Sequence, residues 1–304
     1  MRENAFKIII LASIAIAGCA KKVEPPNFSG EQAYKLLVAQ CDFGPRPPGS
    51  AVHDSFMVWL KNFLDTLADS TEIQYFSAVG YDGEILRMGN IIARFNPGAK
   101  EKIMFCAHWD TRPWADRDPD TTNRKKPILG ANDGASGVAV LLHLAQLMHS
   151  KKPPIGVDIV LFDGEDYGHE GDLNMYLLGS KYYAQNLLGN KPKFAILLDM
   201  IGDSDLNIPK EQFSAIRFAP ELVETLWNRA KKLSLKAFAD TLGPAVIDDH
   251  HPLASAGIKA IDIIDFDYKY WHTQMDTPDK CSPKSLEQVG KLLVDIVYNP
   301  PEIK

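Results

Sequence analysis

The chain has 304 residues and a formal net charge of −6, with 45% hydrophobic and 24% charged residues. These values are ordinary for a folded globular protein and exclude an intrinsically disordered chain. Acidic and basic residues are interspersed and form no basic run, so the charge pattern does not indicate a nucleic-acid partner.

The first residues have the pattern of an export signal. Arg2 and Lys7 precede the apolar run Ile8 to Ala17, which is too short for a good membrane span. The run leads into "IAGC", ending at Cys19, which resembles a bacterial lipobox. In such a segment the cysteine is lipidated and becomes the mature N-terminus.

We therefore expect a lipoprotein signal peptide over residues 1–18, a tether over 19–27 and a membrane anchor at Cys19. The protein would be exported and held in the bacterial cell envelope, facing the periplasm or the cell surface. An ordinary secretory signal or a short anchor is the alternative. The sequence does not indicate which membrane carries the anchor.

The next segments predict two helices and two strands. Ser29 and Gln32 form a capping-box pattern, which predicts a helix through about Ala39. After the break at "FGPRPPGS", apolar residues at helical spacing between Phe56 and Leu67 predict an amphipathic helix. "TEIQYFSA" and "GNIIARFN" alternate as strands do.

The rest of the chain alternates apolar strands with helices. The predicted strands are "KIMFCAHWDT", "VDIVLFDGED", "KFAILLDMIGD" and "KAIDIIDF", and helical patterns separate or follow them. Near-continuous apolar strands between helices indicate a mostly parallel sheet that is covered on both faces. We expect an α/β three-layer sandwich with a central, mostly parallel mixed sheet, in one catalytic domain over residues 28–304.

Acids and histidines follow the predicted strands, where open α/β sheets place their ligand sites. The set is His108, Asp110, Asp163, Glu165, Asp166, Asp199, Asp203 and His272. Asp133 lies in "GANDGASG", before the most apolar helix, and "DDHH" spans residues 248–251. We expect these side chains to meet at one edge of the sheet.

Each of these residues alone has a structural explanation; Asp133, for example, could cap a helix. Together, converging carboxylates would repel one another and take up protons unless a cation held them. Imidazole mixed with carboxylate favours zinc over calcium or magnesium. Glu165 and Asp166 are neighbours and cannot face one ion equivalently, so we expect one to bind the metal and the other to move a proton.

At this point the motifs carry a family resemblance. "HWD", "GANDGASG", "FDGED", "LLDMIGD" and "YWHTQMDT" occur in the order found in the M28 family of zinc metallopeptidases, and the resemblance covers most of the chain. It implies a phosphorylase/hydrolase-like α/β sandwich. Two activities compete within this superfamily, those of the dinuclear aminopeptidases and those of the glutaminyl cyclases.

The resemblance implies different metal sites for the two activities. An aminopeptidase would hold two zinc ions through His108, Asp133, Asp166, Asp199 and His272. A cyclase would hold one zinc ion through Asp133, Asp166 and His272, with His108 and Asp199 present but not ligating. "RPPGS", the "DDH" at 248–250 and the tryptophan before His272 resemble the cyclases, so we favour cyclisation of an N-terminal glutamine on a peptide or protein.

In the cyclase reading, the resemblance implies a role for each site residue. Glu165 would transfer protons and Asp199 would hold the attacking amine. Asp248 would bind the leaving amide nitrogen, and Trp271 would form an apolar wall. Asp249 and His108 would also contact the substrate.

The sequence departs from the animal cyclases at two positions. Asp166 stands where they have glutamate, and Gly171 stands where they have a tryptophan that lines the pocket. Trp109, Trp114 and Tyr167 are the candidates to replace that wall.

Three other questions stay open. A cell-surface binding module that lost catalysis is a further alternative, but every position needed for chemistry is filled. Cys41, Cys106 and Cys281 allow at most one disulfide if Cys19 is lipidated. The oligomeric state is not indicated.

Overall fold

The structure, a computed structural model, describes residues 24–169 and 171–303. The expected signal peptide, most of the tether and Cys19 lie outside the described residues. Within the described part, no helix is both long and apolar enough to cross a bilayer.

The main sheet of the described chain has six strands in the order β1-β2-β4-β3-β5-β8. Their bounds are β1 Ser70–Val79, β2 Ile85–Phe95, β3 Lys102–His108, β4 Gly156–Phe162, β5 Ala195–Asp199 and β8 Ala260–Ile264. The long β1–β2 hairpin pairs antiparallel to β4, whereas β4, β3, β5 and β8 run parallel to one another. The expected mixed, mostly parallel sheet is confirmed.

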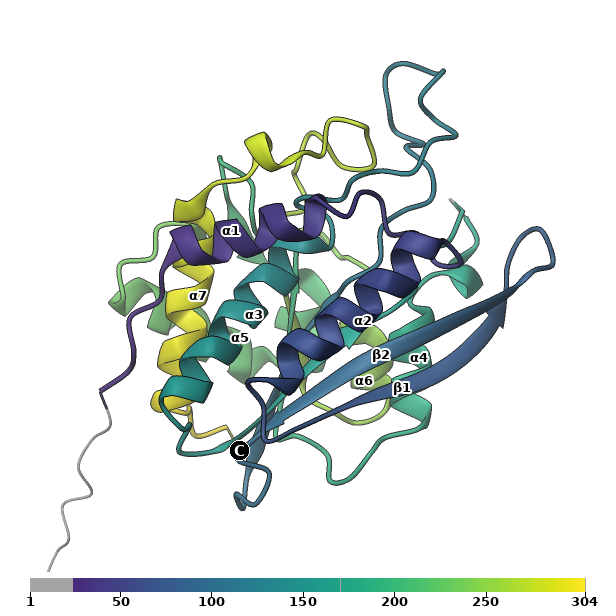
Figure 1. Ribbon diagram of the computed structural model, residues 1–304. Helices are drawn as coiled ribbons and strands as arrows, with labels where there is room; N and C mark the ends of the chain where they lie inside the picture. The colour runs from purple at the N-terminus through teal and green to yellow at the C-terminus, as the bar shows by residue number, and fades with distance from the viewer. Residues whose placement is uncertain (1–23, 170, 304) are drawn as a thin grey trace, which may run out of the picture.

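Helices cover both faces of this sheet (Figure 1). On one face lie α1 (Gly30–Cys41), α2 (Ala51–Asp65), α3 (Ala135–Ser150), α5 (Pro220–Lys232) and α7 (Pro283–Tyr298). On the other lie α4 (Leu178–Gln185) and α6 (His250–Ser255). The remaining elements are a small parallel pair, β6 (Ile208–Lys210) and β7 (Phe238–Leu242), a π-helical turn, Ser214–Phe218, and 3₁₀ turns at Leu173–Met175 and Pro278–Lys280.

The strands are apolar on both sides because each face packs against helices. Successive residues of β3 alternate between two clusters: Phe105 and Ala107 join the larger core, and Met104 and Cys106 join the smaller one. α3 lies in the larger core and is buried along most of its length, as its sequence predicts. The two-sided burial explains why these strands read as continuous apolar runs rather than alternating ones.

Local signals set several helix boundaries. Ser29 and Ser50 cap α1 and α2 by accepting the backbone N–H groups of Gln32 and His53. α1 ends at Cys41, two residues beyond the expected end. Of the described residues, Cys41, Cys106 and Cys281 are buried free thiols, so the structure contains no disulfide among them.

Candidate metal and catalytic site

The polar residues that follow the strands meet at one edge of the sheet. His108 ends β3 and Asp199 ends β5, while Asp166 follows β4 and His272 follows β8. Because these four strands are parallel and adjacent, their carboxyl ends open onto the same place. Asp133 reaches it from the loop before α3.

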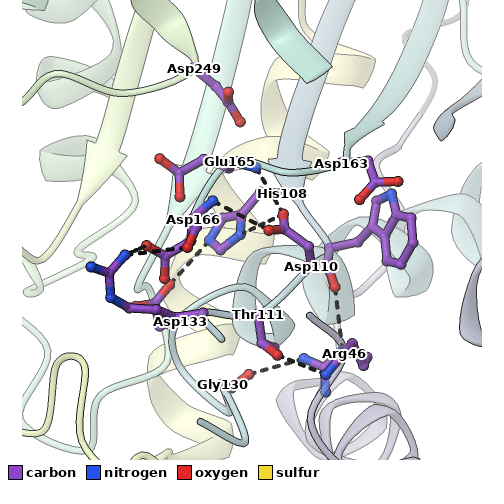
Figure 2. Close-up of polar contacts among 12 residues, drawn as sticks. Arg46, His108, Asp110, Thr111, Gly130, Asp133, Asp163, Glu165, Asp166 and Asp249 are labelled. Atoms are coloured by element: carbon purple, nitrogen blue, oxygen red, sulfur yellow. Dashed lines mark hydrogen bonds and ion pairs between the residues drawn. The ribbon is translucent and has the colours of Figure 1, made fainter. Parts of the chain in front are cut away.

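Asp133 is shared by two groups of side chains that could each hold a metal ion. One group is His108, Asp133 and Asp199, and the other is Asp133, Asp166 and His272; within each, the ligand atoms lie within 4.8 Å of one another. Oδ1 of Asp133 lies 3.2 Å from Nε2 of His108, and Oδ2 lies 3.7 Å from Nε2 of His272. Figure 2 shows His108 between Asp133 and Asp110.

The two groups differ in how their atoms are paired. In the first, Nε2 of His108 lies 3.2 Å from both Asp133 Oδ1 and Asp199 Oδ1. In the second, Oδ2 of Asp133 and Oδ2 of Asp166 are buried and accept no hydrogen bond from the described residues. Buried, unpaired carboxylate oxygens are costly unless a cation occupies the space between them. A donor set of two carboxylates and one imidazole fits zinc.

Charge in this group is shared among neighbours. Burial opposes protonation of His272, but Asp166 and Asp116 raise its pKa to about 9. Burial raises the pKa of Asp166, but His272 and Arg112 outweigh it and hold the pKa below its usual value. For Asp133, burial and the neighbouring Asp166 raise the pKa. The metal-free group therefore keeps protons that a dication would displace.

The backbone at His272 and Gly134 is shaped for this arrangement. His272 has φ 56°, a left-handed conformation that is unfavourable for a residue with a Cβ and that recurs at functional sites. Gly134, next to Asp133, has φ 96°. A Cβ there would lie 2.8 Å from the Asp110 carbonyl oxygen and 3.1 Å from Cε1 of His108, so only glycine fits.

The neighbouring acids of "FDGED" have different environments. The Asp110 carboxylate accepts the backbone N–H groups of Glu165 (3.0 Å) and Asp166 (3.3 Å), which fixes the turn. The Asp166 side chain contacts Arg112 and His272. Glu165 lines the cavity together with Asp248, and burial raises its pKa well above the ordinary value.

Asp163, the first acid of that segment, has a structural role. Its Oδ1 lies 2.7 Å from Nε2 of His53, and its Oδ2 accepts the backbone N–H of Gly89 at 2.7 Å. It thus ties α2 and β2 to the end of β4. Asp203 is also outside the site, because it forms a β-bridge with Cys281.

A cavity of about 320 Å³ opens above the candidate metal groups. Asp133, Glu165, Asp166, Asp199, Asp248 and His272 line its polar side. Its apolar side includes Tyr176, Met200, Val246, Ile264, Phe266 and Trp271. The Phe266 and Trp271 rings lie 5.2 Å apart between centroids, and Arg117 stacks on the Trp271 ring. The cavity can therefore hold a short, partly apolar group against a cation and several acids.

The expectation that Asp249 and His108 contact substrate stays a prediction. Both are almost completely buried, and neither is among the described residues that line the cavity. Burial raises the pKa of Asp249 to about 7. His108 contacts two acids that line the cavity, Asp133 and Asp199, each at 3.2 Å from its Nε2.

The structure corrects the three candidates for the apolar wall of the cavity. Trp109 is fully buried and stacks on His53. Trp114 and Tyr167 pack in a separate aromatic cluster with Tyr81. None of these three is among the described residues that line the cavity; Phe266, which packs against Trp271, lines it instead.

Sequence reasoning missed three residues that support the site. Arg112 and Asp116 contact Asp166 and His272, and Asp276 holds the Asp133 loop. Arg112 and Asp276 lie within or beside the motifs "HWD" and "YWHTQMDT". The available signal was an arginine two positions after the "HWD" motif, since a cluster of converging acids needs compensating charge.

The fold and the site together define an α/β protein of the metalloenzyme type, with candidate metal groups at the carboxyl edge of the parallel strands. Residues 90–297 match the sequence model of peptidase family M28. The chain belongs to this family.

Solved structures with the same fold carry two kinds of name. A glutaminyl cyclase of Bacteroides thetaiotaomicron, bound to N-acetylhistamine, is 38% identical, with a TM-score of 0.87 over 91% of this chain and 100% of that one. A leucine aminopeptidase precursor of Bacteroides thetaiotaomicron is 39% identical, with a TM-score of 0.88 over 92% of this chain and 100% of that one. A mouse glutaminyl-peptide cyclotransferase-like protein is 24% identical over 301 residues, covering 90% of this chain and 75% of that protein.

Proposed function

We infer that this protein is a glutaminyl-peptide cyclotransferase, which converts the N-terminal glutamine of a peptide or protein to pyroglutamate and releases ammonia. The observation that carries this proposal is the size of the cavity and the set of residues that line it. Its volume of about 320 Å³ suits one folded side chain, and Glu165, Asp199, Asp248 and Trp271 surround the space above a candidate metal group. The similarity to bacterial glutaminyl cyclases supports the same reaction.

We propose one zinc ion per chain, held by Asp133, Asp166 and His272. The support is that Oδ2 of Asp133 and Oδ2 of Asp166 accept no hydrogen bond from the described residues, whereas Nε2 of His108 lies 3.2 Å from both Asp133 and Asp199. When bound, zinc supplies Lewis-acid polarisation of the glutamine side-chain carbonyl.

The acids of the cavity then have separate tasks. Glu165 takes a proton from the α-amine of the substrate and gives it to the amide nitrogen, which leaves as ammonia. The α-amine nitrogen forms a bond to the side-chain carbonyl carbon (Cδ), and the bond between that carbon and the amide nitrogen breaks. Burial raises the pKa of the Glu165 carboxyl group, so it holds a proton more readily than an exposed glutamate, which suits a group that accepts a proton and returns it.

Asp199 and Asp248 hold the two nitrogens of the substrate. Both line the cavity, so Asp199 can accept a hydrogen bond from the attacking amine and Asp248 one from the leaving amide. Trp271 and Phe266 pack against each other and form one apolar wall for the aliphatic part of the substrate, which favours the folded conformation. Because nucleophile and electrophile belong to one molecule, orientation supplies much of the rate gain.

The deciding experiment incubates purified protein with a glutamine-initiated dipeptide and with a leucine-initiated one. We expect ammonia and a pyroglutamyl product from the first, and no free amino acid from either. Release of free leucine without ammonia would rule out the cyclase function.

A dinuclear aminopeptidase is the second candidate. The observation that favours it is the group His108, Asp133 and Asp199, which shares Asp133 with the group Asp133, Asp166 and His272 as a bridging ligand would. The similarity to a leucine aminopeptidase precursor points the same way. Metal analysis separates the two functions: two ions per chain together with peptide trimming would establish the aminopeptidase.

We further propose that the protein is exported and anchored to the cell envelope through a lipid on Cys19. The support is the sequence alone, a short apolar run that ends in "IAGC". Cys19→Ser should move the protein from the membrane fraction to the soluble fraction. Mass spectrometry should detect the lipidated N-terminal peptide in the wild type and not in the variant. An unmodified Cys19 in the membrane fraction would contradict the anchor.

A further inference from the structure

Arg112 is a buried arginine that lies between two carboxylates at the metal groups. Its Nη1 donates to Oδ1 of Asp166 at 2.6 Å and to the Asp166 carbonyl oxygen at 3.3 Å. Its Nε and Nη2 donate to the two oxygens of Asp116 at 2.9 and 2.7 Å. Nη2 also donates to the Tyr176 hydroxyl at 3.0 Å. Each guanidinium nitrogen thus has a protein partner, so Arg112 is engaged by protein although it lines the cavity.

Asp116 connects this arginine to the histidine of the same metal group. Its Oδ1 lies 3.4 Å from Nδ1 of His272. A histidine that binds a metal through Nε2 carries its proton on Nδ1 and donates it to a carboxylate or carbonyl. Asp116 therefore selects the tautomer in which Nε2 faces Asp133 and Asp166.

Arg112 also decides which oxygen of Asp166 is available. Oδ1 is occupied by the guanidinium, whereas Oδ2 is buried and has no hydrogen-bond partner among residues 24–169 and 171–303. Asp166 can then offer one oxygen to an ion. The Arg112 guanidinium and the Asp116 carboxylate thus form a chain of contacts that joins Asp166 to His272.

We propose that Arg112 and Asp116 form a positioning pair that holds Asp166 and His272 in ligating geometry before the ion binds, and that limits Asp166 to one ligand oxygen. The proposal rests on the metal site of the proposed function, and it is independent of whether the site cyclises glutamine or trims peptides. Neither residue has a role in the chemistry itself.

The test measures the zinc affinity of the metal-depleted full chain by competition with a chromophoric chelator. We expect Arg112→Met and Asp116→Asn to raise the zinc Kd about 10–100-fold, as loss of a group that orients a metal ligand does. Arg112→Lys keeps the charge beside Asp166 but cannot donate to both oxygens of Asp116. Its zinc Kd should therefore lie between that of the wild type and that of Arg112→Met. The visible spectrum of the cobalt-loaded variants should change, because it reports ligand geometry.

Arg229 and Asp295 provide a matched control. Nη1 of Arg229 lies 3.3 Å from Oδ2 of Asp295, and both side chains are partly exposed on α5 and α7, away from the cavity. Arg229→Met and Asp295→Asn should leave the zinc Kd and the cobalt spectrum unchanged, whatever they do to the melting temperature.

Two outcomes overturn the proposal. If the Arg112 and Asp116 variants melt earlier but bind zinc with wild-type Kd and spectrum, the pair only stabilises the fold. If the zinc Kd is unchanged and the KM for peptide rises, Arg112 binds substrate. Should Arg112→Met fail to fold, Arg112→Lys and Asp116→Asn decide by the same measurements. Wild-type protein that binds zinc in this pattern but releases no ammonia would overturn the proposed function and leave the positioning pair intact.

Discussion

The Asp276 carboxylate accepts the backbone N–H of Asp133 at 3.1 Å, although the two residues are 143 positions apart. Its other oxygen accepts the N–H of Asn132 at 2.8 Å and the Tyr268 hydroxyl at 2.8 Å. Asp276 is fully buried, and burial together with the Asp133 charge raises its pKa to about 7. The loop that carries the shared metal ligand is thus held by a residue four positions after His272.

Asp276→Ala should therefore destabilise the protein and weaken metal binding together. It leaves two buried N–H groups unpaired, at about 1–3 kcal/mol for each, and it frees the Asp133 loop. Urea unfolding and a zinc competition titration measure the two effects. Asp279→Ala, at an exposed position nearby, is the control and should change neither. A destabilised variant with unaltered zinc Kd would show that Asp276 does not position Asp133.

Glu165→Gln should abolish turnover and leave zinc bound. Glutamine has nearly the same size but cannot take up a proton, so we expect a loss of at least about 10²–10⁴-fold, the range of general acid–base catalysis. Ammonia release and metal analysis on the same sample are the measurements. Asp166→Asn is the matched variant and should lose zinc, since it weakens a proposed ligand. Loss of the metal from Glu165→Gln would contradict these roles and would indicate that Glu165 is the ligand.

The left-handed backbone of His272 predicts an unusual order of stability among its variants. Asparagine tolerates this conformation and alanine does not, so metal-free His272→Asn should be more stable than His272→Ala by about 1 kcal/mol. Urea unfolding checks the difference. The same substitutions at His149, an exposed position in α3, should give the opposite order because alanine is the better helix former. If alanine were the more stable substitution at both positions, backbone strain at His272 would be excluded.

Asp262 predicts a pH-dependent stability. It is fully buried on β8, and neither carboxylate oxygen accepts a hydrogen bond from the part of the chain that the structure describes. Burial and the neighbouring Asp248 raise its pKa well above the ordinary value. A raised carboxyl pKa means that the folded state binds more protons than the unfolded state, so this group lowers the free energy of unfolding as pH rises above about 4.

Asp262→Asn removes that penalty. In the metal-free protein, the stability of the variant relative to wild type should increase with pH by up to about 1.4 kcal/mol per unit between pH 4 and the raised pKa. Urea unfolding at pH 5 and pH 8 measures the increase. Asp205→Asn, at an exposed position, should show no such trend. A constant difference for Asp262→Asn at both pH values would contradict ionisation of a buried carboxyl group.

The amino-acid sequence by itself determined the sheet and the place of the site. Apolar runs such as Val157 to Phe162, each ending in acids, identify buried parallel strands because that pattern depends only on neighbouring residues. The carboxyl ends of such strands meet at one edge, so the convergence of His108, Asp166, Asp199 and His272 follows from their places after the strands.

Only the tertiary structure decided what surrounds those residues. The link from Arg112 to Asp166 spans 54 positions and that from Asp276 to Asp133 spans 143, and no local pattern encodes either contact. The same holds for the cavity wall: Trp109, a candidate from sequence, lies in the core, and Phe266 faces the cavity instead. Loop packing fixes these positions, because side-chain direction in a loop depends on contacts with distant segments rather than on a repeating backbone geometry.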